Sequence, residues 1–314
     1  MKYVFGPVRS RRLGRSLGVD PVPLKTCNWN CVYCQLGRSR PMVATREAWV
    51  PAEDVVAEVR QTLEARGDGI DWITFAGSGE PTLHAQLGWM LASVKEMTEI
   101  PVAVITNGVL LHDPEVRAAL RGVDAVLPSL DAGTDALYRK VVRPHPEATF
   151  ERLVQGLTAF RQEFTGYLWV ETMLIRGLND DEAALEQLAH VLEPIAPNEI
   201  HLNVTVRPPS EPWVAPPEAA ALDRAAEILG RVAPVVVPSG RGVFVLDEGR
   251  DPVEQILEVI ERHPLPERVL SEGLAHLGEA TRAALFAQLE ATGRAQRVER
   301  QGEPSWVARS AFFS

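Results

Sequence analysis

The sequence predicts an α/β protein: a barrel of parallel strands with helices outside it, followed by a small C-terminal winged helix-turn-helix domain. Three observations predict this fold. Short β-rich apolar runs alternate with stretches of helical spacing, which is typical of repeated βα units. The polar motifs lie at strand ends, which favours an open or closed barrel over a doubly wound sheet. Near the C-terminus, three helical patterns followed by a hairpin indicate a winged helix.

The βα alternation occupies most of the chain before the winged-helix pattern. The first predicted helix begins at Pro51, where a proline is well tolerated, and Val55 and Val59 belong to its apolar stripe. This first helix is predicted at 51–66, and the other helices are predicted at 84–97, 114–120, 149–164, 181–192 and 218–229. Strands are predicted at 70–76, 102–106, 125–130, 167–175 and 199–206. A proline-rich segment, 207–217, breaks this pattern and is expected to be a loop that closes one end of the barrel.

The C-terminal segment is expected to form a domain of its own. We predict a barrel domain over 1–245 and a winged-helix domain over 250–314. The second contains helices at 252–262, 267–277 and 280–292 and strands at 295–300 and 305–309. Residues 251–314 hold seven basic and ten acidic side chains. Because a domain that grips duplex DNA is normally basic, we expect this one to bind a protein or to dock on the barrel at least as readily as to bind nucleic acid.

Composition indicates a globular protein of about two domains. The chain has 314 residues, of which 46% are hydrophobic and 24% charged. These values exclude a disordered chain, a collagen-like chain and a disulfide-rich miniprotein. The apolar stretches are shorter than the roughly 18 residues that a membrane helix needs, and the first residues lack the apolar region of a signal peptide. The sequence therefore predicts a cytoplasmic protein that does not bind membranes.

Charge is distributed unevenly along the chain. The net charge is −10, but the first 46 residues carry nine basic side chains and one acidic side chain. These basic residues either pair with the acidic remainder or form a local site for an anionic substrate, such as a nucleotide, an RNA or a phosphorylated metabolite. The candidate substrate residues are Arg9, Arg11, Arg12 and Arg15.

The three cysteines of the chain, Cys27, Cys31 and Cys34, lie within eight residues of one another. Thiolates in C-x3-C-x2-C spacing are soft ligands that suit zinc or an iron–sulfur cluster, and their odd number argues against a disulfide. A structural zinc site needs a fourth ligand, and none of the seven histidines shows a matching spacing. Three cysteines on a four-iron cluster would leave one iron open to another ligand.

With Tyr33 directly before the last cysteine, this segment resembles the signature of the radical S-adenosylmethionine (SAM) superfamily. The resemblance implies a partial (βα)6 barrel, with the cysteine loop after its first strand. It also implies a [4Fe–4S] cluster whose open iron binds the amino and carboxylate groups of SAM. An electron from a reductant such as flavodoxin or ferredoxin would cleave SAM, and the resulting 5′-deoxyadenosyl radical would abstract a hydrogen atom from the substrate.

The segment Gly77-Ser78-Gly79-Glu80 follows a predicted strand and resembles the GGE motif of this superfamily, with Ser78 in place of the first glycine. The two remaining glycines would let the backbone approach SAM closely, and Glu80 would offer its charge to the SAM ammonium. A dinucleotide-binding loop is excluded, because the position that its third glycine would take holds Thr82.

Two further strand ends carry polar residues in the order expected from the resemblance. Thr106 and Asn107 resemble a TNG sequence near the adenosyl end of SAM, although such a sequence also forms ordinary turns. Ser129 and Asp131 resemble an S-x-D segment. They alternate along a strand, so both can face the SAM ribose or carboxylate, unless they instead cap the helix that begins near Thr134.

The last two predicted strands of the barrel supply the candidate catalytic residues. Glu171 is a lone carboxylate in an apolar run, where burial is costly unless the charge is paired. On the next strand, His201, Asn203, Thr205 and Arg207 share one face. This polar face either lines a cavity or lies at a solvated edge of the sheet. The candidate catalytic residues are Glu171, Asn203 and Arg207.

The segments 5–19 and 34–38, together with Lys25, resemble a bacterial and archaeal branch of Fe–S oxidoreductases loosely related to wyosine-forming enzymes. The absence of a fourth cysteine argues against a second cluster, and therefore against wyosine formation and sulfur donation. The expected activity is hydrogen abstraction from an anionic substrate. Two alternatives remain: a radical SAM enzyme that modifies a peptide or protein, and a non-catalytic Fe–S redox sensor that binds DNA through its winged helix.

Overall fold

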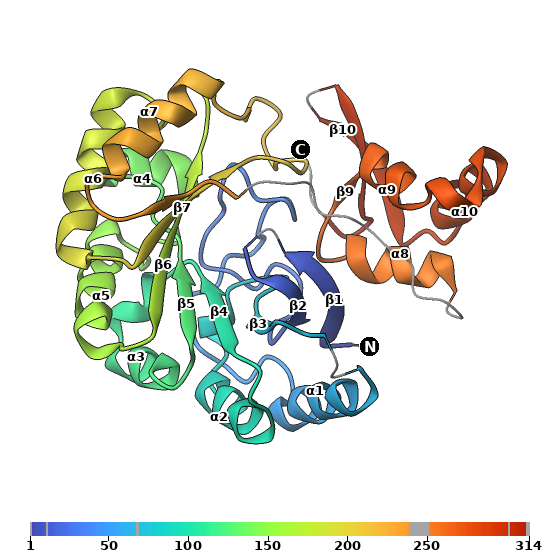
Figure 1. The fold of residues 1–314 in the computed structure, drawn as a ribbon, viewed down its shortest axis with the longest axis horizontal. Coiled ribbons are helices and arrows are strands. Elements are labelled where there is room, and N and C mark those ends of the chain that lie inside the picture. Colours follow the sequence, from blue (N-terminus) through green and yellow to red (C-terminus); the bar gives the residue numbers. More distant parts are fainter. Residues whose placement is uncertain (1, 11, 67–68, 239–250, 301, 312–314) are drawn as a thin grey trace.

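A computed structural model describes residues 2–10, 12–66, 69–238, 251–300 and 302–311 (Figure 1). Its main sheet has eight strands whose spatial order follows the sequence, from β1 to β8. Strand β1 is antiparallel to β2, and β2 to β8 are parallel to one another. No pairing joins β8 to β1 among the described residues, so the barrel is open. The strands are β1 Val4–Ser10, β2 Gly14–Val19, β3 Trp72–Phe75, β4 Val102–Thr106, β5 Ala125–Pro128, β6 Tyr167–Leu174, β7 Glu199–Val204 and β8 Val235–Val236.

Helices cover the outer face of this sheet (Figure 1). Each parallel strand from β2 to β7 is followed by a helix before the next strand, which confirms the predicted α/β barrel architecture. The side chains of Thr134, Thr149 and Asp181 cap helices by accepting a hydrogen bond from the backbone N–H three residues later. The helices are α1 Ala52–Arg66, α2 Leu87–Met97, α3 Pro114–Leu120, α4 Asp135–Val142, α5 Phe150–Glu163, α6 Glu182–Ile195 and α7 Ala219–Leu229, with short 3-10 turns η1 Pro81–Leu83 and η2 Val109–His112.

Several elements differ from the sequence prediction. The strand pattern did not predict the hairpin of β1 and β2, because its glycines, proline and arginines obscure the alternation, although the resemblance implied a strand before the cysteine loop. One of these glycines, Gly18, is needed there because a Cβ atom would come within 2.1 Å of the Phe5 ring. Helix α4 was also not predicted. The helix predicted from residue 84 begins instead at Leu87, because η1 occupies the preceding turn.

Apolar side chains fill the barrel interior at the amino ends of the parallel strands. Leu13, in the turn between β1 and β2, packs there with Ala103, Ala125 and Leu127. The rings of Trp72 and Trp169 meet edge to face beside them, with centroids 5.7 Å apart. This end of the barrel is therefore a packed core, which leaves the carboxyl ends of the strands for a polar site.

The C-terminal residues form a second unit with its own core, built around buried side chains such as Ile256, Leu270 and Trp306. The three helices and the hairpin that the sequence predicts are present, and a two-residue strand, β9, completes an antiparallel sheet of order β10-β11-β9. The predicted domain boundary, between 245 and 250, lies outside the described residues. No helix in the described ranges is long and apolar enough to cross a membrane. The elements are α8 Pro252–Ile260, β9 Leu265–Pro266, α9 Glu267–Gly273, η3 Ala275–Leu277, α10 Glu279–Ala291, β10 Ala295–Arg300 and β11 Glu303–Ala308.

Candidate active site

The loop after β2, hereafter the cluster loop (residues 20–39), holds the three cysteines as free thiols that are each half-buried. Its backbone is anchored from two sides. The N–H of Val32 donates to the carbonyl of Val141 on α4, at 2.9 Å, and the hydroxyl of Ser210 donates to the carbonyl of Cys31, also at 2.9 Å. The loop is therefore tied to neighbouring segments through its main chain, and these anchors do not involve the sulfur atoms.

These thiols fit an iron–sulfur cluster better than a single metal ion. No group of three or more His, Cys, Asp or Glu side chains among the described residues is arranged to hold one ion. A [4Fe–4S] cluster binds each cysteine through a different iron atom, so its ligands need not converge on one point. Burial raises the pKa of Cys27 to about 12 and also raises that of Cys31. The free thiols of Cys27 and Cys31 are therefore protonated at neutral pH, and iron would supply the positive charge that favours their thiolates.

Lys25 connects the cluster loop to the motif that follows β3. Its Nζ donates to Cys34 Sγ, at 3.1 Å, and to the carbonyl of Gly37, at 2.5 Å. Its backbone N–H donates to the carbonyl of Ser78, at 2.6 Å. Burial lowers the pKa of Lys25, but the nearby cysteines, Cys34 above all, outweigh this effect and raise it. In the sequence analysis Lys25 appears only among the residues that carry the branch resemblance. Its contact with Cys34 was not predicted, because the sequence does not show where the ammonium group lies.

The glycines of the segment Gly77–Glu80 are required by contact with the cluster loop. A Cβ atom on Gly79 would lie 2.1 Å from the carbonyl oxygen of Thr26, and Gly77 has a φ of +145°. The N–H of Glu80 also donates to the carbonyl of Thr26, at 2.8 Å. The close approach that these glycines permit in the structure is therefore between two loops of the protein. Their predicted contact with SAM remains a prediction.

Glu80 joins two of the motifs that the sequence identified. Its side chain is 2% exposed, and its Oε1 accepts hydrogen bonds from the hydroxyls of Thr82 and Thr106, both at 2.6 Å. Its Oε2 accepts from the N–H of Asn107, at 2.6 Å. Burial raises the pKa of Glu80, and these hydrogen bonds act against that effect. Because both carboxylate oxygens bind protein donors, Glu80 organises the strand ends here, and its contact with the SAM ammonium remains a prediction.

Tyr33 and Asp131 are also brought together. The Tyr33 hydroxyl donates to Asp131 Oδ2, at 2.6 Å, and the N–H of Met173 donates to Asp131 Oδ1, at 2.7 Å. Burial raises the pKa of Asp131 to about 6. The cap of α4 is Thr134, so Asp131 does not cap that helix. Ser129 is half-buried and pairs with Glu171 through a parallel bridge, which places it at the same edge of the sheet.

Three predicted residues meet inside the barrel: Arg12, Glu171 and Asn203. Arg12 Nη1 lies 2.5 Å from Glu171 Oε1 and 3.0 Å from Asn203 Oδ1. Strand β7 lies between β6 and β8, so its polar face lines the interior and is not a solvated edge. The Nε atom of Arg12 and the hydroxyl of Thr205 are buried without a hydrogen-bond partner in the described part of the chain. This polar layer supplies the donors and acceptors that could face a bound molecule.

Among the other candidate arginines, Arg15 lies at the hairpin, away from the cluster loop. It is the backbone partner of Arg9 in the strand register, and its N–H donates to Asp71 at the amino end of β3. Arg11 lies outside the described residues. The cluster loop follows the opposite end of β2. The anion site expected from these four arginines therefore remains a prediction; the hairpin turn lies at the amino end of β2, and Arg12 is paired with Glu171.

Arg207 lies at the carboxyl end of the barrel, beside the cluster loop. Its Nη1 donates to the side-chain oxygen of Gln35, at 2.7 Å, and Gln35 directly follows Cys34.

Glu211, in the proline-rich segment, accepts hydrogen bonds from Arg38, at 2.7 Å, and from Arg143, at 2.5 Å. Burial favours a higher pKa for Glu211, but the two arginines lower it below its usual value. Sequence reasoning missed Glu211, whose partners lie far away along the chain.

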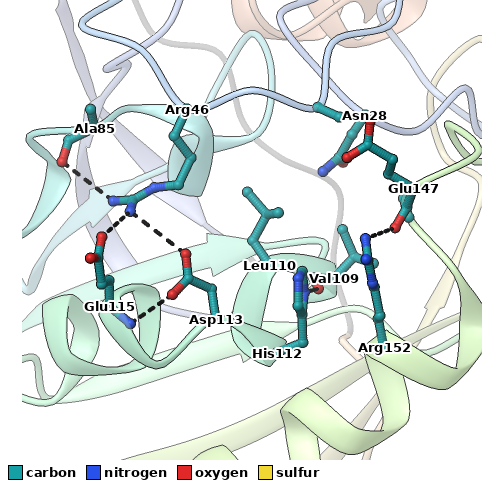
Figure 2. A pocket seen from close by; sticks show the side chains of 12 residues that line it. Asn28, Arg46, Ala85, Val109, Leu110, His112, Asp113, Glu115, Glu147 and Arg152 are labelled. Atoms are coloured by element: carbon teal, nitrogen blue, oxygen red, sulfur yellow. Dashed lines mark hydrogen bonds and ion pairs between the residues drawn. The ribbon is translucent and has the colours of Figure 1, made fainter.

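A cavity of about 500 Å³ adjoins the outer side of this region (Figure 2). Its lining includes the polar side chains of Arg46, His112 and Arg152 and the apolar side chain of Leu110. Asn28 also lines it, and accepts a hydrogen bond from Asn107 at 2.6 Å. The cavity therefore reaches the cluster loop at Asn28, the residue next to Cys27. The motifs discussed in the sequence analysis did not predict this cavity.

The ion pair inside the barrel makes a testable contribution to stability. We expect Arg12→Met to lower the free energy of unfolding by about 3 kcal/mol, because it leaves Glu171 buried without its partner. The double variant Arg12→Met/Glu171→Leu should recover most of this loss, since it removes both charges. Urea denaturation of the three proteins measures the difference. Equal stability of the single and double variants would show that Glu171 does not need Arg12.

The profile of the Radical SAM superfamily matches residues 22–189, which is more than half of the chain and includes all three cysteines. The chain therefore belongs to the Radical SAM superfamily. It is an enzyme of the kind that uses a [4Fe–4S] cluster and S-adenosylmethionine. Within this superfamily it groups with the UPF0026 proteins. It is 32% identical over 278 residues to a UPF0026 protein of Methanocaldococcus jannaschii, covering 87% of this chain and 86% of that protein.

Two other similarities are informative in different ways. The chain is 40% identical over 206 residues to a protein of Brachyspira hyodysenteriae named GTPase Obg, covering 66% of this chain but only 30% of that protein. It therefore spans less than a third of the length of that relative. A solved structure of TYW1 with a lysine-pyruvate adduct bound has a TM-score of 0.53 at 21% identity, covering 73% of this chain and 76% of that one. This likeness shows a shared fold.

Proposed function

We propose that the protein uses a single [4Fe–4S] cluster, bound by Cys27, Cys31 and Cys34, to cleave SAM reductively and abstract a hydrogen atom from an anionic substrate. One observation carries this proposal: three free, half-buried thiols lie on the loop that the Gly77–Glu80 motif supports. The chain has no other cysteine, which supports one cluster. When bound, the cluster and SAM supply the 5′-deoxyadenosyl radical.

The residues around the cluster loop hold SAM in this proposal. Gly77 and Gly79 are half-buried in a segment whose Ser78 and Glu80 bind the backbone of Lys25 and Thr26, directly before Cys27. Tyr33, with its hydroxyl fixed by Asp131, is held beside the last cysteine. The remaining residues assigned to SAM binding are Thr106, Asn107, Ser129 and Asp131, at or just after the carboxyl ends of β4 and β5.

The substrate is proposed to bind at the same end of the barrel, over its polar interior. Glu171 and Asn203 line this interior and act on the substrate, with Arg12 fixing their orientation through its guanidinium. Arg207 is half-buried at the rim, where a guanidinium can bind a phosphate or carboxylate. This charge favours a nucleotide, an RNA or a phosphorylated metabolite as the substrate.

The C-terminal unit, residues 250–314, is proposed to be a winged-helix domain that docks on the barrel of residues 1–245. Its helices and antiparallel sheet support the winged-helix assignment. Arg268, Arg294 and Arg297 pair with glutamates of the same unit, so they are not free to bind the phosphates of DNA. A flavodoxin or ferredoxin would supply the electron. Free thiols suit the reducing cytoplasm, which we propose as the location.

Product formation with defined substrates tests this proposal. The protein is reconstituted with iron and sulfide without oxygen, reduced, and mixed with SAM and either a nucleotide, an RNA, a phosphorylated metabolite or a peptide. We expect an anionic small molecule or RNA to raise the rate of 5′-deoxyadenosine formation about tenfold or more, because substrate binding completes the site. Stimulation by peptides alone would support the peptide-modifying alternative. Tight, redox-dependent DNA binding without SAM cleavage would support the regulator.

A further inference from the structure

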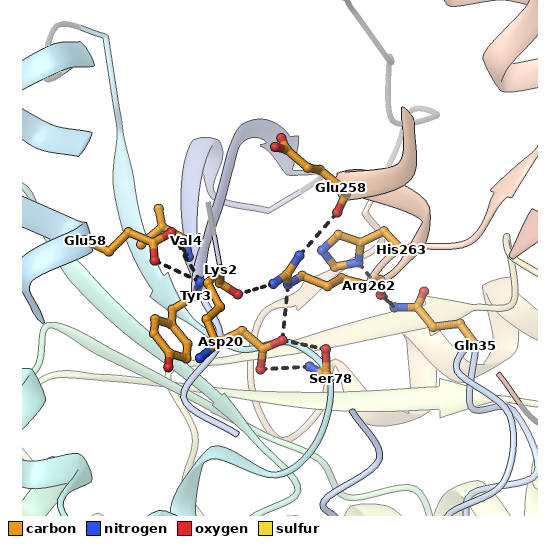
Figure 3. Close-up of polar contacts among 10 residues, drawn as sticks. All are labelled: Lys2, Tyr3, Val4, Asp20, Gln35, Glu58, Ser78, Glu258, Arg262 and His263. Atoms are coloured by element: carbon orange, nitrogen blue, oxygen red, sulfur yellow. Dashed lines mark hydrogen bonds and ion pairs between the residues drawn. The ribbon is translucent and has the colours of Figure 1, made fainter. Parts of the chain in front are cut away.

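The C-terminal unit reaches the candidate active site through Arg262, two residues after the end of α8 (Figure 3). Arg262 Nε lies 3.3 Å from Asp20 Oδ2, and its Nη2 donates to the carbonyl of Lys2, at 2.6 Å. The guanidinium also lies over the Phe5 ring, 5.4 Å from its centroid. Only 11% of the Arg262 side chain is exposed. This arginine of the second unit is therefore buried against the first strands of the barrel.

Asp20 connects Arg262 to the Gly77–Glu80 segment after β3. Its side chain is 5% exposed, and its two oxygens accept hydrogen bonds from the N–H of Ser78, at 3.1 Å, and from the Ser78 hydroxyl, at 2.5 Å. Burial raises the pKa of Asp20, and the hydrogen bonds from Ser78 and the charge of Arg262 act against this rise. Asp20 thus lies between Ser78 and Arg262 and is bound by both (Figure 3).

The next residue, His263, makes a second contact with the same region. Its Nδ1 lies 3.3 Å from Gln35 Nε2 and 3.2 Å from Arg207 Nη1, and its ring meets the Phe5 ring edge to face. Gln35 directly follows the last cysteine. Two consecutive residues of the C-terminal unit therefore contact both the cluster loop and, through Asp20, the motif at the end of β3.

We propose that Arg262 is a positioning residue for SAM binding: by holding Asp20, it fixes Ser78 and the Gly77–Glu80 segment, so that the C-terminal unit completes the SAM site of the barrel. The inference rests on the proposed function in one respect, that this segment receives SAM. It also gives a reason for a serine in a motif that resembles GGE. The hydroxyl of Ser78 adds a second hydrogen bond to Asp20, which a glycine could not make.

The physical reason is the cost of an unpaired buried charge. Without Arg262, the carboxylate of Asp20 would keep its hydrogen bonds to Ser78 but lose the only cation that the described residues place against it. It would then turn toward water or take up a proton, and either change weakens its hold on the Ser78 backbone. The Gly77–Glu80 segment would then be less ordered in the absence of SAM. Binding would have to order it, and this free-energy cost would lower the affinity for SAM.

SAM affinity tests the inference in the full-length protein with its cluster reconstituted. We expect Arg262→Gln to raise the dissociation constant for SAM about tenfold, as measured by equilibrium dialysis, because it removes a charge-assisted contact. Arg262→Lys should recover part of the affinity. The matched control is Arg294→Gln, which breaks pairs with Glu254 and Glu261 inside the same unit and should leave the affinity unchanged.

Amide hydrogen exchange supplies a readout that does not depend on SAM. In the protein without SAM, Arg262→Gln should speed the exchange of the Ser78 amide, and Arg294→Gln should not. Ser78→Gly provides a second variant that leaves the unit interface in place. In the Ser78→Gly background, Arg262→Gln should have a smaller effect on SAM affinity than it has alone, because both variants break the same link.

The outcomes separate this inference from the proposed function. Failure of the wild-type protein to bind SAM would overturn the proposed function, while the exchange of the Ser78 amide would still report the link through Asp20. The inference would be overturned if the Arg262→Gln variant bound SAM as tightly as the wild-type protein and its Ser78 amide exchanged at the wild-type rate. Fully additive effects of Arg262→Gln and Ser78→Gly would overturn it as well, since independent residues would then be responsible.

Discussion

Replacing Cys31 with alanine is expected to remove the cluster from the reconstituted protein. The iron content should fall from about four atoms per chain to less than one, because two thiolates on one loop do not hold a [4Fe–4S] cluster stably. The fold should persist, since Cys31 sits on a loop whose backbone is bound by Val141, through Val32, and by Ser210. Iron analysis and the electron paramagnetic resonance (EPR) signal of the reduced protein measure the effect.

The matched control lies on the same loop. Ser39→Ala removes a hydrogen bond from the Ser39 hydroxyl to the carbonyl of Trp29, at 3.2 Å, without removing a sulfur atom. This variant should bind iron like the wild-type protein. If Cys31→Ala retained about four irons and the same EPR signal, the assignment of Cys31 as a cluster ligand would be wrong.

Replacing Lys25 with methionine is expected to lower the reduction potential of the cluster by about 60–120 mV. The ammonium donates to Cys34 Sγ, at 3.1 Å, and a charge-assisted hydrogen bond of about 1.5–3 kcal/mol favours the reduced, more negative cluster. Methionine keeps a long side chain of similar size without charge. Lys25→Arg keeps the charge and should give an intermediate potential. A redox titration followed by EPR measures each midpoint.

Arg38→Gln is the control for a general loss of positive charge near the cluster. Arg38 lies on the same loop, but its guanidinium binds Glu211 and no sulfur atom among the described contacts. Its removal should change the potential much less than removal of Lys25. Equal shifts in Lys25→Met and Arg38→Gln would contradict a direct effect of the hydrogen bond, and an unchanged potential in Lys25→Met would contradict any electrostatic role.

Local patterns were sufficient to predict the parallel strands β3 to β7 and most of the helices. The strand at Val102–Thr106 and the helix at Pro114–Leu120 have the predicted bounds, because strand alternation and helix spacing depend on neighbouring residues. The β1–β2 hairpin could not be predicted in this way. Gly18 is there to make room for the Phe5 ring, and the sequence pattern does not show that packing contact.

The parts of the site that sequence reasoning missed depend on contacts between distant residues. Arg12 and Glu171 were assigned separately, one to the substrate and one to catalysis, but they form one ion pair. Asp20 and Arg262 are separated by 242 positions, so no spacing rule connects them. The sequence identifies residue types suited to the chemistry, whereas their pairing is decided by how the strands of the barrel curve together and where the second unit contacts them.

Cleavage of SAM by the reduced wild-type protein tests the central claim most directly. The reconstituted protein is incubated with SAM in the absence of oxygen, with and without a strong reductant. The products are separated by chromatography and identified by mass spectrometry. The account predicts 5′-deoxyadenosine that forms only with reductant and is absent from the Cys31→Ala variant. Recovery of intact SAM from a protein whose cluster is present and reduced would contradict it.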